Sequence, residues 1–212
     1  SYRVKLKNGK EIFDLRTFSI QNPNTRRYLS EWYFHKLLEE VQLISLKNKY
    51  IEITENKKHK GVYHLEESFD KKLLINSGRI NGPILKFDES ILIDKNIIND
   101  LNTFNENELF LMAKIEVFKS NKTLKDSILN DEFIHGKSLI NKLRFNEIEL
   151  DKVIDIDKAA KLFAVADLTG GHHGLRWKNV RFYYNPISKR LELIGFDSNS
   201  GLYITDIYYN LW

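Results

Sequence analysis

The amino-acid sequence predicts an α+β fold of antiparallel hairpins and helices. Alternating apolar and polar residues flank turn signals in the first third of the chain and again near its C-terminal end, as is typical of β-hairpins. Apolar residues recur at helical spacing in the middle of the chain and between Ile156 and Ala166. Strands and helices therefore come in blocks, without the regular strand–helix–strand alternation of a parallel sheet.

Three hairpins and one further strand are predicted from alternation around short turns. The clearest turn signal is Asn8-Gly9, which favours a two-residue hairpin loop. The hairpins are expected at residues 2–15, at 49–54 with 61–67 across a basic turn, and at 179–184 with 190–197 around the turn 185–188; the further strand is expected at 82–88.

Predicted helices begin at capping residues and end at glycines. Asp155 caps the clearest of them, and Gly170-Gly171 end it. The others are expected from Asn24 or Thr25 to about Leu43, at 71–76 with Gly78 closing the helix, and at several places between about Asp94 and Leu150, most clearly at 107–118.

Composition excludes several classes of function. The chain has 212 residues, of which 42% are hydrophobic and 12% aromatic, which suits one compact domain or two small lobes. Its net charge of +4 comes without a basic helix or block, so nucleic acid is not an expected partner. Cysteine is absent, which excludes disulfides and thiolate metal sites. Possible metal ligands are therefore His, Asp, Glu and Asn.

Targeting signals are not visible in the sequence. No apolar run reaches membrane-spanning length, and no signal peptide is visible in the given sequence. Because the chain opens directly on a strand-like segment, we expect it to be a piece of a longer protein. A cell-surface or extracytoplasmic location would follow if a signal sequence had been removed; the sequence leaves the compartment open.

Two polar residues of the last predicted hairpin are candidate ligands for a hard cation. Asp197 ends an apolar strand, and Asn179 begins its partner strand. Mg²⁺ in nucleotide sites typically takes one or two carboxylates together with phosphate oxygens. The alternative is that Asp197 caps a turn and Asn179 bonds within its own loop, which is routine for Asx residues.

Other candidates lie on the earlier strands. Lys86 sits among apolar residues of the strand 82–88, where it either reaches into a cleft to neutralise phosphate or is exposed to solvent. Glu66 and Glu67 end a strand, where they either hold a metal, pair with a lysine or are solvated. Gly61 follows the basic turn, and backbone N–H groups of such a turn can contact phosphates.

His172 and His173 are adjacent in a glycine-flanked loop. Neighbouring residues of an extended strand point to opposite faces, so two ligands to one ion would need an irregular loop. A metal-dependent hydrolase that uses zinc or manganese at this pair is therefore one hypothesis, although no HExxH helix accompanies it.

Four segments in order resemble the CotH family of spore-coat-type atypical protein kinases found in bacteria. They are LRTFSIQNPNTRRYLSEWYFHKLLEEVQL, YIEITENKKHKGVYHLEESFDKKLL, GPILKFDE and GGHHGLRWKNVRFYYNPISKRLELIGFDSNSG. The resemblance implies a single domain over residues 1–212, with a β-rich part to about residue 92 and a helical part with a catalytic hairpin after it. It also implies a minimal kinase-like fold in which hairpins and helices surround a nucleotide cleft.

The resemblance further implies roles for individual residues. Lys86 matches the lysine that contacts nucleotide phosphates, Gly61 lies in the turn over the nucleotide, and Glu67 matches the family glutamate. Asn179 matches the catalytic-loop asparagine, and Asp197 matches the metal aspartate. The implied cofactors are ATP and Mg²⁺ or Mn²⁺, and the implied partners are a protein substrate or a surface or coat protein.

One position departs from the family pattern. The family usually carries a catalytic-base aspartate several residues before the asparagine, and here His172 or His173 stands at that place. A neutral histidine accepts a hydroxyl proton near pH 7, so a kinase remains the first hypothesis. A catalytically inactive pseudokinase that serves as a binding or assembly module is the second hypothesis.

Overall fold

The computed structural model describes residues 1–92 and 106–201, which divide into two compact units. Of the described residues, the first unit contains 1–81, 160–175 and 195–201, and the second contains 82–92, 106–159 and 176–194. The described residues form seven α-helices and two four-stranded antiparallel sheets, so the α+β prediction is confirmed. The prediction of a single domain over the whole chain stays a prediction.

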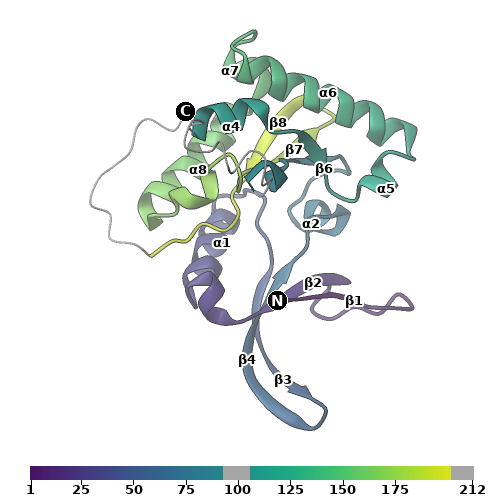
Figure 1. Cartoon of the computed structure of the whole chain (residues 1–212), viewed down its shortest axis with the longest axis vertical. Coiled ribbons are helices and arrows are strands. Elements are labelled where there is room, and N and C mark those ends of the chain that lie inside the picture. The colour runs from purple at the N-terminus through teal and green to yellow at the C-terminus, as the bar shows by residue number, and fades with distance from the viewer. Residues whose placement is uncertain (93–105, 202–212) are drawn as a thin grey trace. The chain divides into compact units, whose positions relative to one another are not determined.

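The sheet of the first unit has the strand order β1-β2-β4-β3 (Figure 1). Its strands are β1 (Tyr2–Lys5), β2 (Thr17–Gln21), β3 (Asn48–Glu55) and β4 (Lys58–Glu67). Leu15, Phe18 and Leu65 are buried against this sheet together with partly buried aliphatic residues. This small apolar core is what holds the strands of the first unit together.

The predicted N-terminal hairpin is wrong in its second strand. β1 pairs with Thr17–Gln21 rather than with residues 11–15. Phe13 and Asp14 have positive φ angles of 53° and 61°, and Ile12 and Leu15 bond to each other through their backbones. Residues 12–15 therefore form a second tight turn, and the strand that pairs with β1 begins only at Thr17.

The second predicted hairpin is confirmed. β3 and β4 are joined by Asn56 and Lys57, whose φ angles of 50° and 65° make the two-residue turn that matches strand twist. Figure 1 shows the pair as one long ribbon. The register shifts between Ile53 and Thr54, opposite Gly61, which has a φ of 88°.

The helices of the first unit correct one predicted boundary. A 3₁₀ turn, η1 (Pro23–Arg26), is capped by the Asn22 side chain, and α1 begins only at Ser30 and ends at Glu40. The two are separated because Arg27 and Tyr28 adopt left-handed backbone conformations, which no helix continues through. The predicted start of one continuous helix at Asn24 or Thr25 is therefore wrong. α2 (Lys71–Asn76) is confirmed.

The second unit contains the sheet with order β6-β5-β7-β8. Its helical segments are η2 (Glu89–Leu92), α4 (Glu106–Met112), α5 (Ser120–Thr123), α6 (Ser127–Arg144) and α7 (Leu150–Val153). Its strands are β5 (Ile84–Phe87), β6 (Ile115–Val117), β7 (Arg181–Asn185) and β8 (Arg190–Ile194).

Predictions for this part of the chain are partly confirmed. The strand at 82–88 and the last hairpin are present, but helix at 107–118 is wrong beyond Met112, where β6 forms an edge strand beside β5. Predictions that fall on residues 93–105 lie outside the described residues. The helix capped by Asp155 is confirmed as α8 (Ile156–Thr169), which contributes residues to both units.

Candidate functional site

Asp197 lies in a loop of the first unit whose backbone is held by a buried carboxylate. β8 ends at Ile194, so the predicted strand 190–197 is too long, and Asp197 has a φ of 56°. The N–H groups of Asp197 and Ser198 donate to the two oxygens of Glu31, at 3.0 and 2.9 Å. The Ser198 hydroxyl also donates to Glu31, at 2.7 Å. Glu31 thus holds the loop in a left-handed conformation that is unfavourable for non-glycine residues.

Glu31 is itself fixed in one charge state. His35 lies one helical turn away, with its Nε2 3.2 Å from the Glu31 carboxylate. The Nδ1 of His35 accepts from the Leu46 N–H, so Nε2 carries the proton that faces Glu31. Burial alone would raise the pKa of Glu31, but His35, Ser198 and Arg26 together outweigh it and lower the pKa to about 2. Glu31 is therefore an anion at neutral pH.

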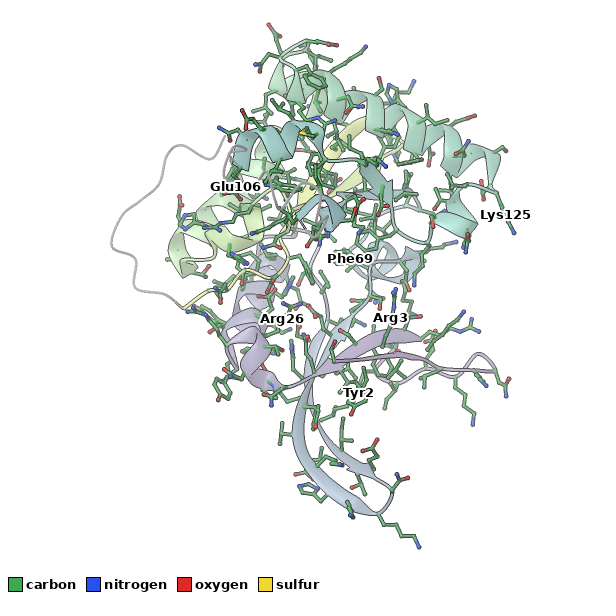
Figure 2. All side chains as sticks on the ribbon, viewed as in Figure 1. Tyr2, Arg3, Arg26, Phe69, Glu106 and Lys125 are labelled. Atoms are coloured by element: carbon green, nitrogen blue, oxygen red, sulfur yellow. The ribbon has the colours of Figure 1, made fainter. Side chains whose placement is uncertain are left out.

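The Asp197 side chain lies between a cation and a histidine. Arg26, which ends η1 and is labelled in Figure 2, donates from Nη1 to Asp197 Oδ1. The Nε2 of His173 lies 3.8 Å from Asp197 Oδ2. His173 comes from η3 (His172–Leu175), which fits closely against the loop: a Cβ on Gly174 would lie 3.1 Å from Ser198 Cα. The structure thus brings two predicted site residues, Asp197 and His173, together.

The two adjacent histidines have different partners. His172 Nε2 lies 2.7 Å from Asp167 Oδ1, on the last turns of α8, whereas His173 faces Asp197. Within residues 1–92 and 106–201, no group of three or more His, Asp or Glu side chains is arranged to hold a metal ion. Each histidine instead lies next to a different carboxylate, His172 next to Asp167 and His173 next to Asp197.

Glu66 and Glu67 are buried rather than solvated at the end of β4. Glu67 accepts from the Lys47 N–H at 2.9 Å and from the Asn76 side chain at 3.3 Å. Burial raises its pKa to about 7, against the opposing effect of Lys47. Glu66 points to the opposite face of the sheet, where it accepts from Gln21 at 2.9 Å and from Arg26 at 3.2 Å. Gly61 lies within β4 beyond the turn itself.

Lys86 and Asn179 belong to the second unit. Lys86 is on β5, which is paired on both sides, and its ammonium lies 3.4 Å from Glu116 and 5.9 Å from the centre of the Phe118 ring. Its side chain is partly exposed, whereas the flanking Leu85 and Phe87 are buried on the other face. Asn179 is buried in the turn before β7, where its N–H donates to the Arg176 carbonyl at 2.8 Å; it does not begin the strand itself.

Sequence reasoning missed Arg26 and Glu31 as site residues, and for Glu66 it considered a metal, a lysine or solvent as the partner rather than an arginine. Arg26 and Asp197 are separated by 171 positions, and Glu31 and Ser198 by 167. The only local signal was the spacing of Glu31 and His35, which places the two side chains on one face of a helix. Such a pair also forms on solvated helices, so by itself it does not indicate a site.

These observations define an α+β protein in which a loop anchored by Glu31 presents the Asp197 carboxylate next to a histidine. A family model described as CotH kinase protein matches residues 1–207, so the chain belongs to the CotH kinase family. None of the curated proteins that were compared matches the chain. In the part of the chain that the structure describes, no helix is long and apolar enough to cross a membrane.

Proposed function

We propose that this protein transfers the γ-phosphoryl group of ATP to a hydroxyl group of a protein, with Mg²⁺ or Mn²⁺ as the divalent ion. The observation that carries the proposal is the Asp197 loop: a carboxylate whose backbone is fixed by Glu31 and whose side chain faces His173. Membership of the CotH kinase family supports it. Phosphoryl transfer needs mainly positioning and charge neutralisation, and a fixed carboxylate provides positioning.

The residues around Asp197 suit a hard divalent ion. Its carboxylate is partly exposed, and the buried anion Glu31 adds negative charge close to Arg26, the cation that pairs with Asp197. Mg²⁺ is commonly held by one or two carboxylates, with phosphate oxygens and water completing its shell, so a cluster of three protein ligands is not required. When bound, the ion would neutralise charge on the transferred phosphoryl group.

His173 is proposed as the group that receives the hydroxyl proton. The phosphorus–oxygen bond to the substrate forms as the bond to the ADP oxygen breaks, and the proton of the hydroxyl passes to the imidazole. His172 is the alternative proton acceptor, with Asp167 orienting its ring. By resemblance to the family alone, Lys86, Gly61 and Glu67 are proposed to serve nucleotide binding, and Asn179 to assist Asp197 in holding the ion.

A second function, a catalytically inactive module of a surface or coat structure, is favoured by a specific observation. Arg26 neutralises Asp197 directly, and histidines stand where the family has its loop aspartate. In that case the same fold would bind a protein partner without transferring phosphate.

Nucleotide-dependent stabilisation distinguishes the two functions. We expect ATP with Mg²⁺ or Mn²⁺ to raise the unfolding temperature of the protein, and Asp197→Asn to abolish the increase. Incorporation of labelled phosphate into a hydroxyl-containing protein substrate would then establish the kinase. Stabilisation without any transfer under either metal would favour the module, and the absence of stabilisation would overturn the proposal.

A further inference from the structure

Arg26 is held between two carboxylates in the first unit. Its Nη1 donates to Asp197, its Nη2 lies 3.2 Å from Glu66 Oε2, and its guanidinium lies 4.8 Å from the centre of the Phe196 ring. The side chain is only 13% exposed. Arg26 therefore links the candidate cation ligand to a buried glutamate that no substrate can reach directly.

The link leaves one donor and one acceptor unused. Arg26 Nε and Glu66 Oε1 are both buried, and neither has a hydrogen-bond partner among the residues that the structure describes. A buried polar group without a partner is unfavourable, because it has lost its hydrogen bonds to water. The Nε and Nη2 groups of a guanidinium form a fork that matches both oxygens of one carboxylate. The two unused atoms thus belong to a bidentate Arg26–Glu66 pair that is only half made.

Glu66 is the fixed member of this pair. The Gln21 amide donates to Glu66 Oε2 at 2.9 Å, and the glutamate lies in the central part of the sheet on β4, between β2 and β3. Because the guanidinium is rigid and planar, a turn that brings Nε to Glu66 Oε1 also displaces Nη1 from its present position on Asp197. The Phe196 ring offers a surface over which the cation can turn while it keeps its cation–π contact.

We propose that Arg26 is a movable counter-ion that controls access of the divalent ion to Asp197. Without the ion, Arg26 neutralises Asp197; when the ion binds, Arg26 leaves Asp197 and closes onto Glu66 with two parallel hydrogen bonds. This inference rests on the proposed function, because it assumes that Asp197 holds the ion. Glu66 acts as a positioning residue: it stabilises the ion-bound state without contacting the ion.

Titration with Mn²⁺, followed by electron paramagnetic resonance in the absence of nucleotide, tests the proposal. We expect Glu66→Gln to weaken Mn²⁺ binding about tenfold, because coupling between linked sites is typically 5- to 150-fold. In an Arg26→Gln background the same Glu66→Gln change should have little further effect. Glu39→Gln, which removes the same charge from an exposed position of α1, is the matched control and should leave binding unchanged.

The outcomes separate this inference from the proposed function. If the unaltered protein binds no Mn²⁺, or if Asp197→Asn leaves binding intact, the proposed function itself fails at this site. If Mn²⁺ binds through Asp197 but Glu66→Gln has the same effect with and without Arg26, the glutamate acts only through its charge and the counter-ion proposal is overturned.

A second measurement needs no altered glutamate. Nuclear magnetic resonance of ¹⁵N-labelled protein reports the Nε–H of Arg26, identified by its loss in Arg26→Lys. Addition of Mg²⁺ should move this signal to the position of a hydrogen-bonded Nε–H, because Nε would then donate to Glu66 Oε1. A Nε–H signal that does not respond at saturating Mg²⁺ would contradict the movement.

Discussion

Glu31 shows how a single buried carboxylate can organise a loop that is distant in sequence. It accepts two backbone N–H groups and one hydroxyl from residues 197–198, and His35 lies beside it on α1. Breaking a buried charged pair by removing one partner typically costs about 3–5 kcal/mol, because the remaining group is left uncompensated. Glu31 therefore contributes to stability and to the geometry of Asp197 at once.

Glu31→Gln should destabilise the protein and loosen the loop. A glutamine cannot accept all three hydrogen bonds in the same way and removes the charge that faces His35. We expect the free energy of unfolding to fall by about 3 kcal/mol, within the range for broken buried pairs. We also expect faster hydrogen exchange at the Asp197 and Ser198 amides. Glu39→Gln is the control for charge, and unchanged exchange at both amides would contradict the role of Glu31.

Glu67 provides a prediction about how the stability of the protein depends on pH. Burial raises its pKa in the folded protein from 4.5 to about 7. The folded state therefore binds more protons than the unfolded state between these values, and the contribution of Glu67 to stability is present below pH 4.5 and lost as the pH rises through 7. Over the full interval the loss is at most about 3 kcal/mol.

Glu67→Gln should remove this pH dependence. The glutamine carbonyl can still accept the Lys47 N–H, and Asn76 can reverse its amide to accept from the new amide group. Urea unfolding at pH 5 and pH 8 measures the effect: the variant should be relatively more stable than the unaltered protein at the higher pH. Parallel stability curves for the two proteins would show that Glu67 is not buried in its neutral form.

The β3–β4 hairpin has a turn whose conformation departs from the preference of one of its residues. Lys57 occupies the second position of the turn with a φ of 65°, although a lysine has a Cβ that disfavours this region. An Asn-Gly turn is the strongest two-residue hairpin signal, and Asn56 already occupies its first position. The turn sequence is therefore not optimal for the hairpin it forms.

Lys57→Gly should stabilise the hairpin. Relief of left-handed strain is worth roughly 1 kcal/mol, because that is the usual cost for a residue with a Cβ. Lys58→Gly is the matched control: Lys58 lies in β4, where glycine weakens a strand, so this variant should be destabilised. Thermal unfolding distinguishes the two, and equal changes in both variants would show that the turn conformation does not matter.

At the scale of the first unit, a polar group of residues lies inside the fold alongside the apolar core. Gln21, Glu31, His35, His64 and Glu66 are all buried. His64 stacks on Tyr50 with ring centres 5.2 Å apart, and neither of its ring nitrogens has a hydrogen-bond partner in the described residues. Its burial, with the nearby charge of Arg26, lowers its pKa to about 4.

This histidine should make the whole protein sensitive to acid. Its pKa is 6.5 in an unfolded chain and about 4 in the folded one, so the unfolded state binds more protons between these values. The contribution of neutral His64 to stability is therefore complete above pH 6.5 and is lost as the pH falls toward 4, by at most about 3 kcal/mol. His64→Phe, which keeps a ring against Tyr50, should shift the acid-unfolding midpoint to lower pH. An unchanged midpoint would exclude His64 as the cause.

The sequence by itself determined the features that short segments encode. Turn residues and caps predicted β3–β4, α2, α8 and the last hairpin. The end of an apolar strand made Asp197 a candidate, and the histidine pair at the place of the family aspartate made His173 one. Local signals failed where neighbouring residues adopt left-handed conformations, as at Phe13 and Arg27, because a phenylalanine or an arginine gives no sequence signal for such backbone angles.

Only the tertiary structure decided what surrounds Asp197. Arg26, Glu31 and Glu66 carry no pattern that distinguishes them from solvated side chains, and their partners lie up to 171 positions away. Burial is what gives them their role: it removes water as a competing partner, so each charge must be satisfied by another residue of the fold. Residues of η1, α1 and β4 therefore meet at the Asp197 loop. This arrangement cannot be deduced from any one of these segments alone.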